Sequence, residues 1–256
     1  PQVYQSIFSG KKNVKIEAYR KKLTVFFSDI KGFTEITDRL EPEVLSSLLN
    51  SYLNEMSKIA LKYGGTIDKF VGDAILIFFG DPETKGDKED AYSCVLMALE
   101  MQERMHHLKN LWEGQGITNP LEIRIGINTG YCNVGNFGSE NRLDYTIIGG
   151  EVNLASRLES NAMTGQILIS QETYALIKKH IVCEKKDEIK VKGIAHKIQT
   201  YQVVGSYKNI AQKRKILNEK FDGFNLNIDL NISKKNKVIT SLENTLKQLK
   251  KDEKSN

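Results

Sequence analysis

The chain has 256 residues, and its 40% hydrophobic and 27% charged content is typical of a globular protein with a sizeable core. Its net charge of +5 lies near the C-terminus. Residues 206–256 hold 12 Lys/Arg and 6 Asp/Glu, whereas residues 1–205 hold 25 Lys/Arg and 26 Asp/Glu and are nearly neutral. The nearly neutral body excludes a basic nucleic-acid-binding surface, so we expect no nucleic-acid partner. The basic tail is interpreted as a solvated, lysine-rich helix, with contact to anionic lipid or RNA as the alternative.

The cysteines and the apolar runs indicate a cytoplasmic domain. Cys94, Cys132 and Cys183 are odd in number and far apart, which favours a reducing compartment over a disulfide or zinc framework. The longest apolar run, residues 74–79, is too short to cross a bilayer, and we expect no signal peptide. Because the chain begins with Pro1, we expect a longer protein with a sensor or regulatory domain upstream; membrane attachment of that protein stays open.

The first half of the chain alternates predicted strands and helices. Residues 1–22 are polar and are expected to form an arm, whereas residues 23–27 are apolar and β-rich, as in a buried strand. Apolar residues then recur at helical spacing from Pro42 to Ala60. The next predicted elements are a helix end at Gly64 and Gly65, strands at residues 66–71 and 74–79 joined by a tight hairpin at Gly72 and Asp73, and an amphipathic helix at residues 90–111.

The second half continues the alternation. It predicts strands at residues 121–128 and 131–136, an exposed turn at 138–141, a strand at 143–148, a helix at 151–162, a strand at 166–170, a helix at 171–180, and strands near 188–191 and 199–204. Strands interleaved with helices packed on one side predict an α+β fold with a mostly antiparallel sheet. We therefore expect an arm at residues 1–22, one domain at residues 23–205, and a basic C-terminal extension at residues 206–256 with a short strand and a helix.

Two aspartates lie at the ends of predicted neighbouring strands. Asp29 follows the first buried strand, and Asp73 lies in the hairpin turn. Carboxylates placed there repel each other unless a cation lies between them. Mg²⁺ prefers oxygen ligands and often uses one or two carboxylates together with substrate phosphates. A metal site is one interpretation of the pair, and two ordinary turn or N-cap aspartates are the other.

Two further patterns point to an anion but are individually weak. Residues 30–34 join a strand to a helix through Gly32, and such a turn offers free backbone N–H groups. Asn153 and Arg157 lie at i and i+4 of a predicted helix and share one face, where an arginine beside an amide suits phosphate and sugar. A surface arginine extended along the helix is the alternative.

Five motifs in chain order carry a resemblance to a known family. They are LTVFFSDIKGFT at residues 23–34, KFVGD at 69–73, RIGINTG at 124–130, GGEVNLASR at 149–157 and VKG at 191–193. From about residue 20 to residue 204 the chain resembles the class III adenylate/guanylate cyclase catalytic domain. The resemblance implies a ferredoxin-like βαββαβ core with an additional hairpin, and a dimer with active sites at the subunit interface.

The resemblance also implies roles for individual residues. Asp29 and Asp73 match aspartates that bind two Mg²⁺ or Mn²⁺ ions, with the Ile30 carbonyl as a further ligand. The backbone N–H groups of Phe33 and Thr34 and the side chains of Arg124 and Lys192 match groups that bind the triphosphate. Asn153 matches the residue that orients the ribose, and Arg157 matches the catalytic arginine that stabilises the transition state. The implied reaction is attack of the ribose 3′-hydroxyl on the α-phosphorus, with release of pyrophosphate.

Lys69 and Thr146 match the two positions that read the purine, and they favour ATP over GTP. A lysine only donates hydrogen bonds, which suits adenine N1, an acceptor, and not guanine N1, which carries a proton. Thr146 can accept from the adenine N6 amine, whereas the related guanylate cyclases typically have Glu and Cys at these positions. We therefore expect an adenylate cyclase with ATP as its substrate.

The chain holds both the metal set and the set that contacts base and transition state, so we expect a homodimer with two equivalent composite sites. A non-catalytic signalling module is the first alternative, and it would lack a metal aspartate or the arginine. A diguanylate cyclase is the second, and it would have Gly-Gly-Asp/Glu-Glu-Phe where this chain has Val71, Gly72 and Asp73. The activating signal and the role of residues 206–256 stay open.

Overall fold

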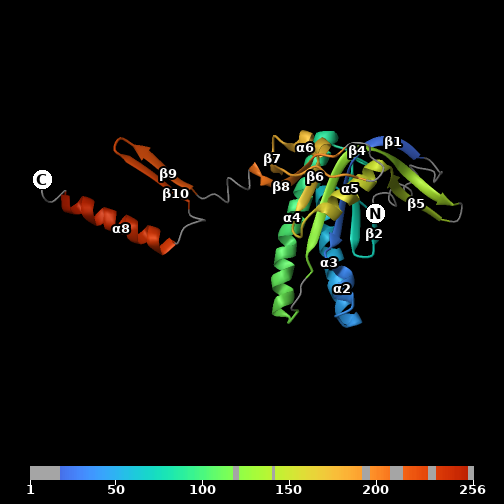
Figure 1. Ribbon diagram of the computed structural model, residues 1–256, viewed down its shortest axis with the longest axis horizontal. Coiled ribbons are helices and arrows are strands. Elements are labelled where there is room, and N and C mark those ends of the chain that lie inside the picture. Colours follow the sequence, from blue (N-terminus) through green and yellow to red (C-terminus); the bar gives the residue numbers. More distant parts are fainter. Residues whose placement is uncertain are drawn as a thin grey trace. The chain divides into compact units, whose positions relative to one another are not determined.

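The computed structural model describes residues 18–117, 121–139, 142–191, 197–207, 216–229 and 235–252, and the chain falls into two compact units, Pro1–Gly205 and Ser206–Asn256. The strands of the first unit are β1 (Ala18–Ile30), β2 (Thr66–Val71), β3 (Ala74–Phe79), β4 (Ile123–Ser139), β5 (Arg142–Ile148), β6 (Ile167–Ser170), β7 (Ile181–Lys185) and β8 (Thr200–Ser206) (Figure 1). Its helices are α2 (Phe33–Thr37), α3 (Pro42–Tyr63), α4 (Asp87–Gly114), α5 (Gly150–Asn161) and α6 (Gln171–Ile177).

The first unit is built on one sheet with the strand order β2-β3-β1-β4-β6-β8-β7, and β5 pairs with β4. The neighbours β2–β3, β3–β1 and β1–β4 are antiparallel, whereas β4 and β6 are parallel. The path β1-α3-β2-β3-α4-β4 with the spatial order β2-β3-β1-β4 is a ferredoxin-like βαββαβ core. The predicted α+β fold with a mostly antiparallel sheet is confirmed, and β4–β5 is the additional hairpin.

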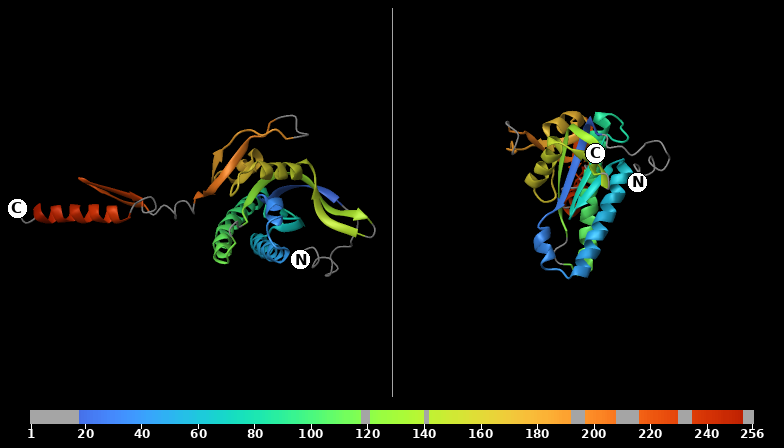
Figure 2. Two further views of the ribbon diagram at one scale, coloured as in Figure 1. Left: turned by 60° about the horizontal axis from the view of Figure 1, so that its bottom comes forward. Right: turned by 90° about the vertical axis from the view of Figure 1, so that its right-hand side faces the viewer.

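Helices cover both faces of this sheet, whereas the sequence pattern predicted helices on one side. Phe26 and Ile30 of β1 pack with α3 and α4 in the main core. Val25 lies on the opposite face, where its cluster includes Ala155 of α5. Figure 2 shows strands between these two helical layers. Because β1 is central and buried on both faces, its sequence is apolar without alternation, as in other two-sided strands.

Helix α5 approaches the backbone of β4 at Gly126. A Cβ added there would lie 2.1 Å from the Glu159 nitrogen and 2.3 Å from the Ala155 carbonyl oxygen. No side chain fits in this space, so only glycine permits the contact. A second glycine of the strand, Gly130, faces the Glu151 side chain, which an added Cβ would meet at 2.6 Å. The two glycines set the distance between α5 and the sheet.

Strand β1 begins at Ala18, so the last residues of the predicted arm are part of the sheet. Hydrogen bonds to a buried carboxylate hold this segment in the sheet, although its polar sequence did not predict a strand. Asp81, which is 2% exposed, accepts hydrogen bonds from the Tyr19 hydroxyl at 2.7 Å and from Lys21 Nζ at 2.8 Å. It also accepts from the Tyr145 hydroxyl of β5. One buried carboxylate therefore joins the start of β1 to β5.

Two other predicted boundaries were wrong. Residues 121–128 and 131–136 were predicted as separate strands, but β4 runs without interruption from Ile123 to Ser139. Gly130, which lies between the two predicted ranges, pairs with Leu23 of β1 inside the continuous strand. Strand β7 was not predicted, and near residues 188–191 the structure has an isolated bridge between Ile189 and Ile198.

The second unit contains the antiparallel strands β9 (Ile216–Phe221) and β10 (Phe224–Asp229) and the helix α8 (Lys235–Asp252). The sequence predicted one strand and a helix there, so β9 was missed. The turn between the strands is Asp222-Gly223, a strong hairpin signal, and Gly223 has a φ of 79°. Phe221 and Phe224 stack beside that turn with their ring centroids 4.6 Å apart. Within the described ranges, no helix combines the length and the apolar character needed to cross a membrane.

We expect Gly126→Ala to destabilise the domain by about 3 kcal/mol or more, because backbone atoms of α5 must move to admit the methyl group. Thermal unfolding should then show a fall in Tm of about 6 °C or more. Gly150→Ala is the matched control in the same region, since an added Cβ there meets nothing within 4 Å. Equal melting temperatures for the two variants would show that the β4–α5 contact is not tight.

Candidate functional site

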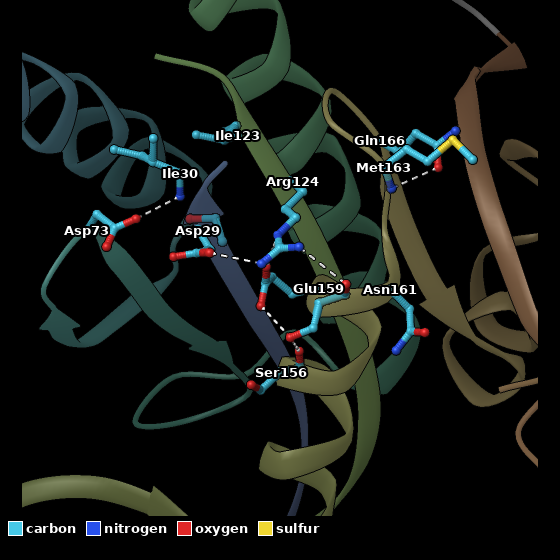
Figure 3. Close-up of polar contacts among 12 residues, drawn as sticks. Asp29, Ile30, Asp73, Ile123, Arg124, Ser156, Glu159, Asn161, Met163 and Gln166 are labelled. Carbon is cyan, nitrogen blue, oxygen red and sulfur yellow. Dashed lines mark hydrogen bonds and ion pairs between the residues drawn. The ribbon is translucent and has the colours of Figure 1, made fainter. Parts of the chain in front are cut away.

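Asp29 lies near the end of β1 and Asp73 in the β2–β3 turn, and the antiparallel sheet brings the two carboxyl groups together (Figure 3). The Ile30 N–H donates to Asp73 Oδ2 at 3.0 Å. Burial, and then the hydrogen bond and negative charge of Asp29, raise the pKa of Asp73 to about 6. The pair is therefore a site of like-charge repulsion, which a bound cation would relieve.

The donors at this pair fit Mg²⁺ or Mn²⁺. Two carboxylates and the neighbouring Ile30 carbonyl offer oxygen donors, and Mg²⁺ usually takes one or two protein carboxylates with water and phosphate oxygens completing its shell. Among the described residues, no group of three or more His, Cys, Asp or Glu side chains is placed to hold a metal. Because the pair offers only two carboxylates, it leaves room around a cation for the oxygens of a phosphate-bearing ligand.

Arg124 of β4 links this pair to α5. Its Nη2 donates to Asp29 Oδ2 at 3.1 Å, its Nε lies 2.5 Å from Glu159 Oε1, and its Nη1 donates to the Ser160 carbonyl at 3.3 Å (Figure 3). Burial raises the pKa of Glu159, which is 5% exposed, and the charge of Arg124 opposes that shift. The structure therefore places Arg124 beside the carboxylate pair, where it partly neutralises Asp29.

The turn after β1 leaves backbone donors available. Gly32 is in the left-handed region with a φ of 69°, and it precedes the short helix α2, which begins at Phe33. No side chain caps the first turn of α2. The N–H groups of Phe33 and Thr34 belong to this first turn, where a helix lacks internal acceptors. They lie three and four residues beyond Ile30, on the connection that leaves the carboxylate pair.

Lys69 and Thr146 come from different hairpins and meet at a third residue, Asp68. The Thr146 hydroxyl donates to Asp68 Oδ2 at 2.7 Å, and Lys69 Nζ lies 3.4 Å from Asp68 Oδ1. Thr146 is 5% exposed, whereas the Lys69 side chain is 44% exposed. The two predicted purine-reading residues are thus brought together by a carboxylate that the sequence analysis did not single out.

Asn153 and Arg157 lie on an exposed face of α5, one turn apart. Among the described residues, no hydrogen bond or ion pair joins their side chains to Asp29 or Asp73. The buried residues of α5 lie on its other faces. Lys192, predicted to contact phosphate, lies outside the described residues. One chain therefore brings together Asp29, Asp73 and Arg124, and separately Lys69 and Thr146, but leaves Asn153 and Arg157 facing away from the core.

Sequence reasoning missed two residues of this region. Glu159 follows Leu158 on the buried side of α5, and an acidic residue in such a position was a usable signal, because buried carboxylates are normally paired. Asp68 gave no such signal. In a regular strand Asp68 and Lys69 would point to opposite faces, but β2 has a register irregularity between Ile67 and Lys69. This bulge is not visible in the residue pattern.

Comparison with known proteins defines the class to which this fold and these residues belong. The sequence model of the adenylate and guanylate cyclase catalytic domain matches residues 14–205. The chain belongs to this family. The predicted family resemblance is thereby confirmed.

Particular relatives include both kinds of cyclase. The solved structure of the adenylyl cyclase CyaB from P. aeruginosa is 64% identical, covers 75% of this chain and 98% of its own, and has a TM-score of 0.74. The guanylyl cyclase Cya2 is 37% identical, covers 75% and 95%, and has a TM-score of 0.71. The terminal-differentiation-specific adenylate cyclase of Dictyostelium discoideum is 35% identical over 77% of this chain. Adenylate cyclase 1 of Rhizobium meliloti is 32% identical over 73% of it. The matches span only 9% and 28% of those two longer proteins.

We expect Asp73→Asn to raise the thermal stability of the metal-free domain at pH 7.5. The pKa of Asp73 is about 6 in the fold and about 3.9 in an unfolded chain, so the carboxylate destabilises the fold above pH 6 and this penalty fades as the pH falls toward 4. After allowance for solvent screening the effect is about 1 kcal/mol, or 2–4 °C in Tm.

Asparagine keeps an acceptor for the Ile30 N–H, so the comparison isolates the charge. Melting curves in a chelator at pH 7.5 and pH 4 measure the effect. Asp144→Asn on β5, where the side chain is 59% exposed, is the control and should change Tm little at either pH. A lower Tm for Asp73→Asn at pH 7.5 would contradict the electrostatic explanation.

Proposed function

We propose that residues 23–205 form an adenylate cyclase domain that converts ATP to 3′,5′-cyclic AMP and pyrophosphate. The observation that carries the proposal is the presence in one chain of the carboxylate pair Asp29–Asp73 and of the pair Lys69–Thr146. A non-catalytic relative would not need to keep two repelling carboxylates at adjacent strand ends. The identity to CyaB, described as an adenylyl cyclase, supports the same conclusion.

Family membership by itself leaves the choice of base open, because adenylyl and guanylyl cyclases both resemble this chain. The choice of adenine rests on Lys69 and Thr146. An ammonium group is a donor that matches adenine N1 and opposes the N1–H of guanine. Thr146 offers an acceptor to the N6 amine, and guanine has an acceptor, O6, at that position. With ATP, therefore, no hydrogen-bond donor faces a donor and no acceptor faces an acceptor at this pair.

The reaction forms a bond between the ribose 3′-oxygen and the α-phosphorus and breaks the bond from that phosphorus to the bridging oxygen of pyrophosphate. Two Mg²⁺ or Mn²⁺ ions, held by Asp29, Asp73 and the Ile30 carbonyl, would supply acidification of the 3′-hydroxyl and neutralise phosphate charge. The N–H groups of Phe33 and Thr34 bind the triphosphate at the start of α2.

The remaining polar residues of the site have separate tasks. Arg124 and Lys192 contact the terminal phosphates and hold the leaving pyrophosphate. Asn153 orients the ribose, so that its 3′-oxygen lies in line with the breaking bond. Arg157 donates to the α-phosphate oxygens as negative charge develops on them. Each task uses hydrogen-bond donors that the chain supplies itself.

We further propose that the active enzyme is a homodimer with composite sites. Asn153 and Arg157 are exposed on α5 and do not contact the carboxylate pair in their own chain. A C2 dimer can bring these residues, with Lys69 and Thr146, to the Asp29–Asp73 pair of the second copy and makes both sites alike. One structural neighbour, 31% identical with a TM-score of 0.62, is described as a non-canonical dimeric guanylyl cyclase domain, and another, 29% identical with a TM-score of 0.59, as a monomeric one.

The direct test is an assay of the purified chain with ATP or GTP and with Mg²⁺ or Mn²⁺. We expect cyclic AMP from ATP, and a value of kcat/KM for GTP at least about tenfold lower, because guanine leaves Lys69 and Thr146 mispaired. Chelation should abolish product formation. Chromatography of the products identifies the cyclic nucleotide, and cyclic GMP as the main product would contradict the assignment of the base.

The composite site predicts complementation between two inactive variants. Asp73→Ala and Arg157→Ala should each lose activity by about 100-fold or more. A mixture re-equilibrated at equal amounts should recover about a quarter of wild-type activity, since half of the dimers are mixed and each mixed dimer has one intact site. A mixture of Asp73→Ala with Asp29→Ala is the control and should recover nothing. Mixed dimers without recovered activity would refute shared sites.

A further inference from the structure

Asp68 is a buried carboxylate that no step of the proposed reaction uses. Its side chain is 1% exposed and accepts hydrogen bonds from the Thr146 hydroxyl at 2.7 Å and from the Ile147 N–H at 3.3 Å. It also forms an ion pair with Lys69 Nζ at 3.4 Å. Burial raises the pKa of Asp68, and all three contacts oppose that shift by favouring the charged form. A desolvated charge is retained here only because these donors surround it.

The bulge in β2 is what makes this arrangement possible. The strand pairs Ile67 with Ile77 and Lys69 with Leu76, so Asp68 is the extra residue of the irregular register. Bulges re-aim side chains, and this one lets the side chains of the sequence neighbours Asp68 and Lys69 meet. The same carboxylate reaches β5, where Thr146 and Ile147 donate to it. Two strands that do not pair with each other are thereby held together at the Lys69–Thr146 pair.

The contact with Thr146 determines the direction of its hydrogen bonds. A carboxylate only accepts, so the single proton of the Thr146 hydroxyl is committed to Asp68. The oxygen keeps its lone pairs, and toward a ligand Thr146 can therefore act only as an acceptor. Without Asp68 the hydroxyl would rotate freely and could donate to a guanine O6 as readily as it accepts from an adenine N6 amine.

We propose that Asp68 is a specificity-determining positioning residue, which fixes Thr146 as an acceptor beside the cationic donor Lys69 and thereby selects adenine over guanine. The proposal rests on the proposed function of the Lys69–Thr146 pair. Asp68 does not touch the base; it acts through Thr146. Lys69 remains a donor whether or not Asp68 is charged, so the part of selectivity that comes from Lys69 is independent of Asp68.

The test compares ATP with GTP in Asp68→Asn, measuring kcat/KM for cyclisation and the dissociation constants of both nucleotides with Mg²⁺. The asparagine is nearly isosteric, and its amide can donate to Thr146, which frees the threonine proton for guanine O6. We expect the ATP-to-GTP ratio of kcat/KM to fall about tenfold or more, as for one mispaired buried hydrogen bond. Asp144→Asn removes the same charge from an exposed position on β5 and should leave the ratio unchanged.

A double variant separates positioning from general support of the fold. In a Thr146→Val background there is no hydroxyl to orient, so Asp68→Asn should change the ratio by less than about twofold. Thr146→Ser keeps the hydroxyl and should keep the wild-type ratio. Equal losses with ATP and GTP in Asp68→Asn, or the same change of ratio with valine at position 146, would overturn the proposal.

The outcomes for the wild-type chain keep this proposal distinct from the proposed function. A wild-type chain that forms no cyclic nucleotide refutes the cyclase assignment, but the ratio of dissociation constants for ATP and GTP still tests Asp68. A wild-type chain without preference for ATP in either measurement overturns both. Thermal unfolding reports whether Asp68→Asn folds, and Asp68→Ala, which also frees the Thr146 proton, is the second variant if it does not.

Discussion

The contact between α5 and the backbone of β4 at Gly126 is the constraint on which the rest of the site depends. Backbone atoms of Ala155 and Glu159 occupy the space that any side chain at position 126 would need. This approach brings Glu159 to Arg124, and Arg124 in turn contacts Asp29. The exposed face of α5 is set by the same contact, because a helix pressed on one side presents a fixed opposite side. A glycine therefore determines where charged residues on two elements lie.

The charged side chains of this region lie in a row in which opposite charges alternate except between its first two members. Asp73 and Asp29 repel each other, Asp29 is paired with Arg124, and Arg124 is paired with Glu159. Asp73 has no cationic partner in this row, and burial, followed by the hydrogen bond and negative charge of Asp29, raises its pKa. A divalent cation placed between Asp73 and Asp29 would complete the alternation of charge. The same cation would weaken the ion pair between Asp29 and Arg124, which suits the phosphate contact that we propose for Arg124.

Much of the fold was predictable because its signals are local. The period of α3, the hairpin between β2 and β3, and the uninterrupted apolar run in β1 each follow from neighbouring residues. The errors arose where tertiary contacts decided the outcome. Gly130, between two ranges predicted as separate strands, gives room to Glu151 inside β4, and the polar start of β1 is held by Asp81. For the site, the family resemblance indicated Asp29, Asp73, Lys69 and Thr146, whereas Asp68 depended on a bulge that no pattern encodes.

In the proposed function, the two halves of the candidate site recognise a nucleotide in two different ways. Around Asp29 and Asp73, recognition depends on net charge, which oxygen ligands and a cation satisfy with little regard to the base. Around Asp68, recognition depends on the direction of the Thr146 hydroxyl, whose proton points to Asp68 and whose oxygen faces the ligand. This arrangement requires burial, because an exposed threonine would exchange hydrogen-bond partners with water. Asp81 connects the start of β1 to Tyr145, the residue next to Thr146. The half of the site that contains Asp68 and Thr146 is therefore joined directly to the start of β1.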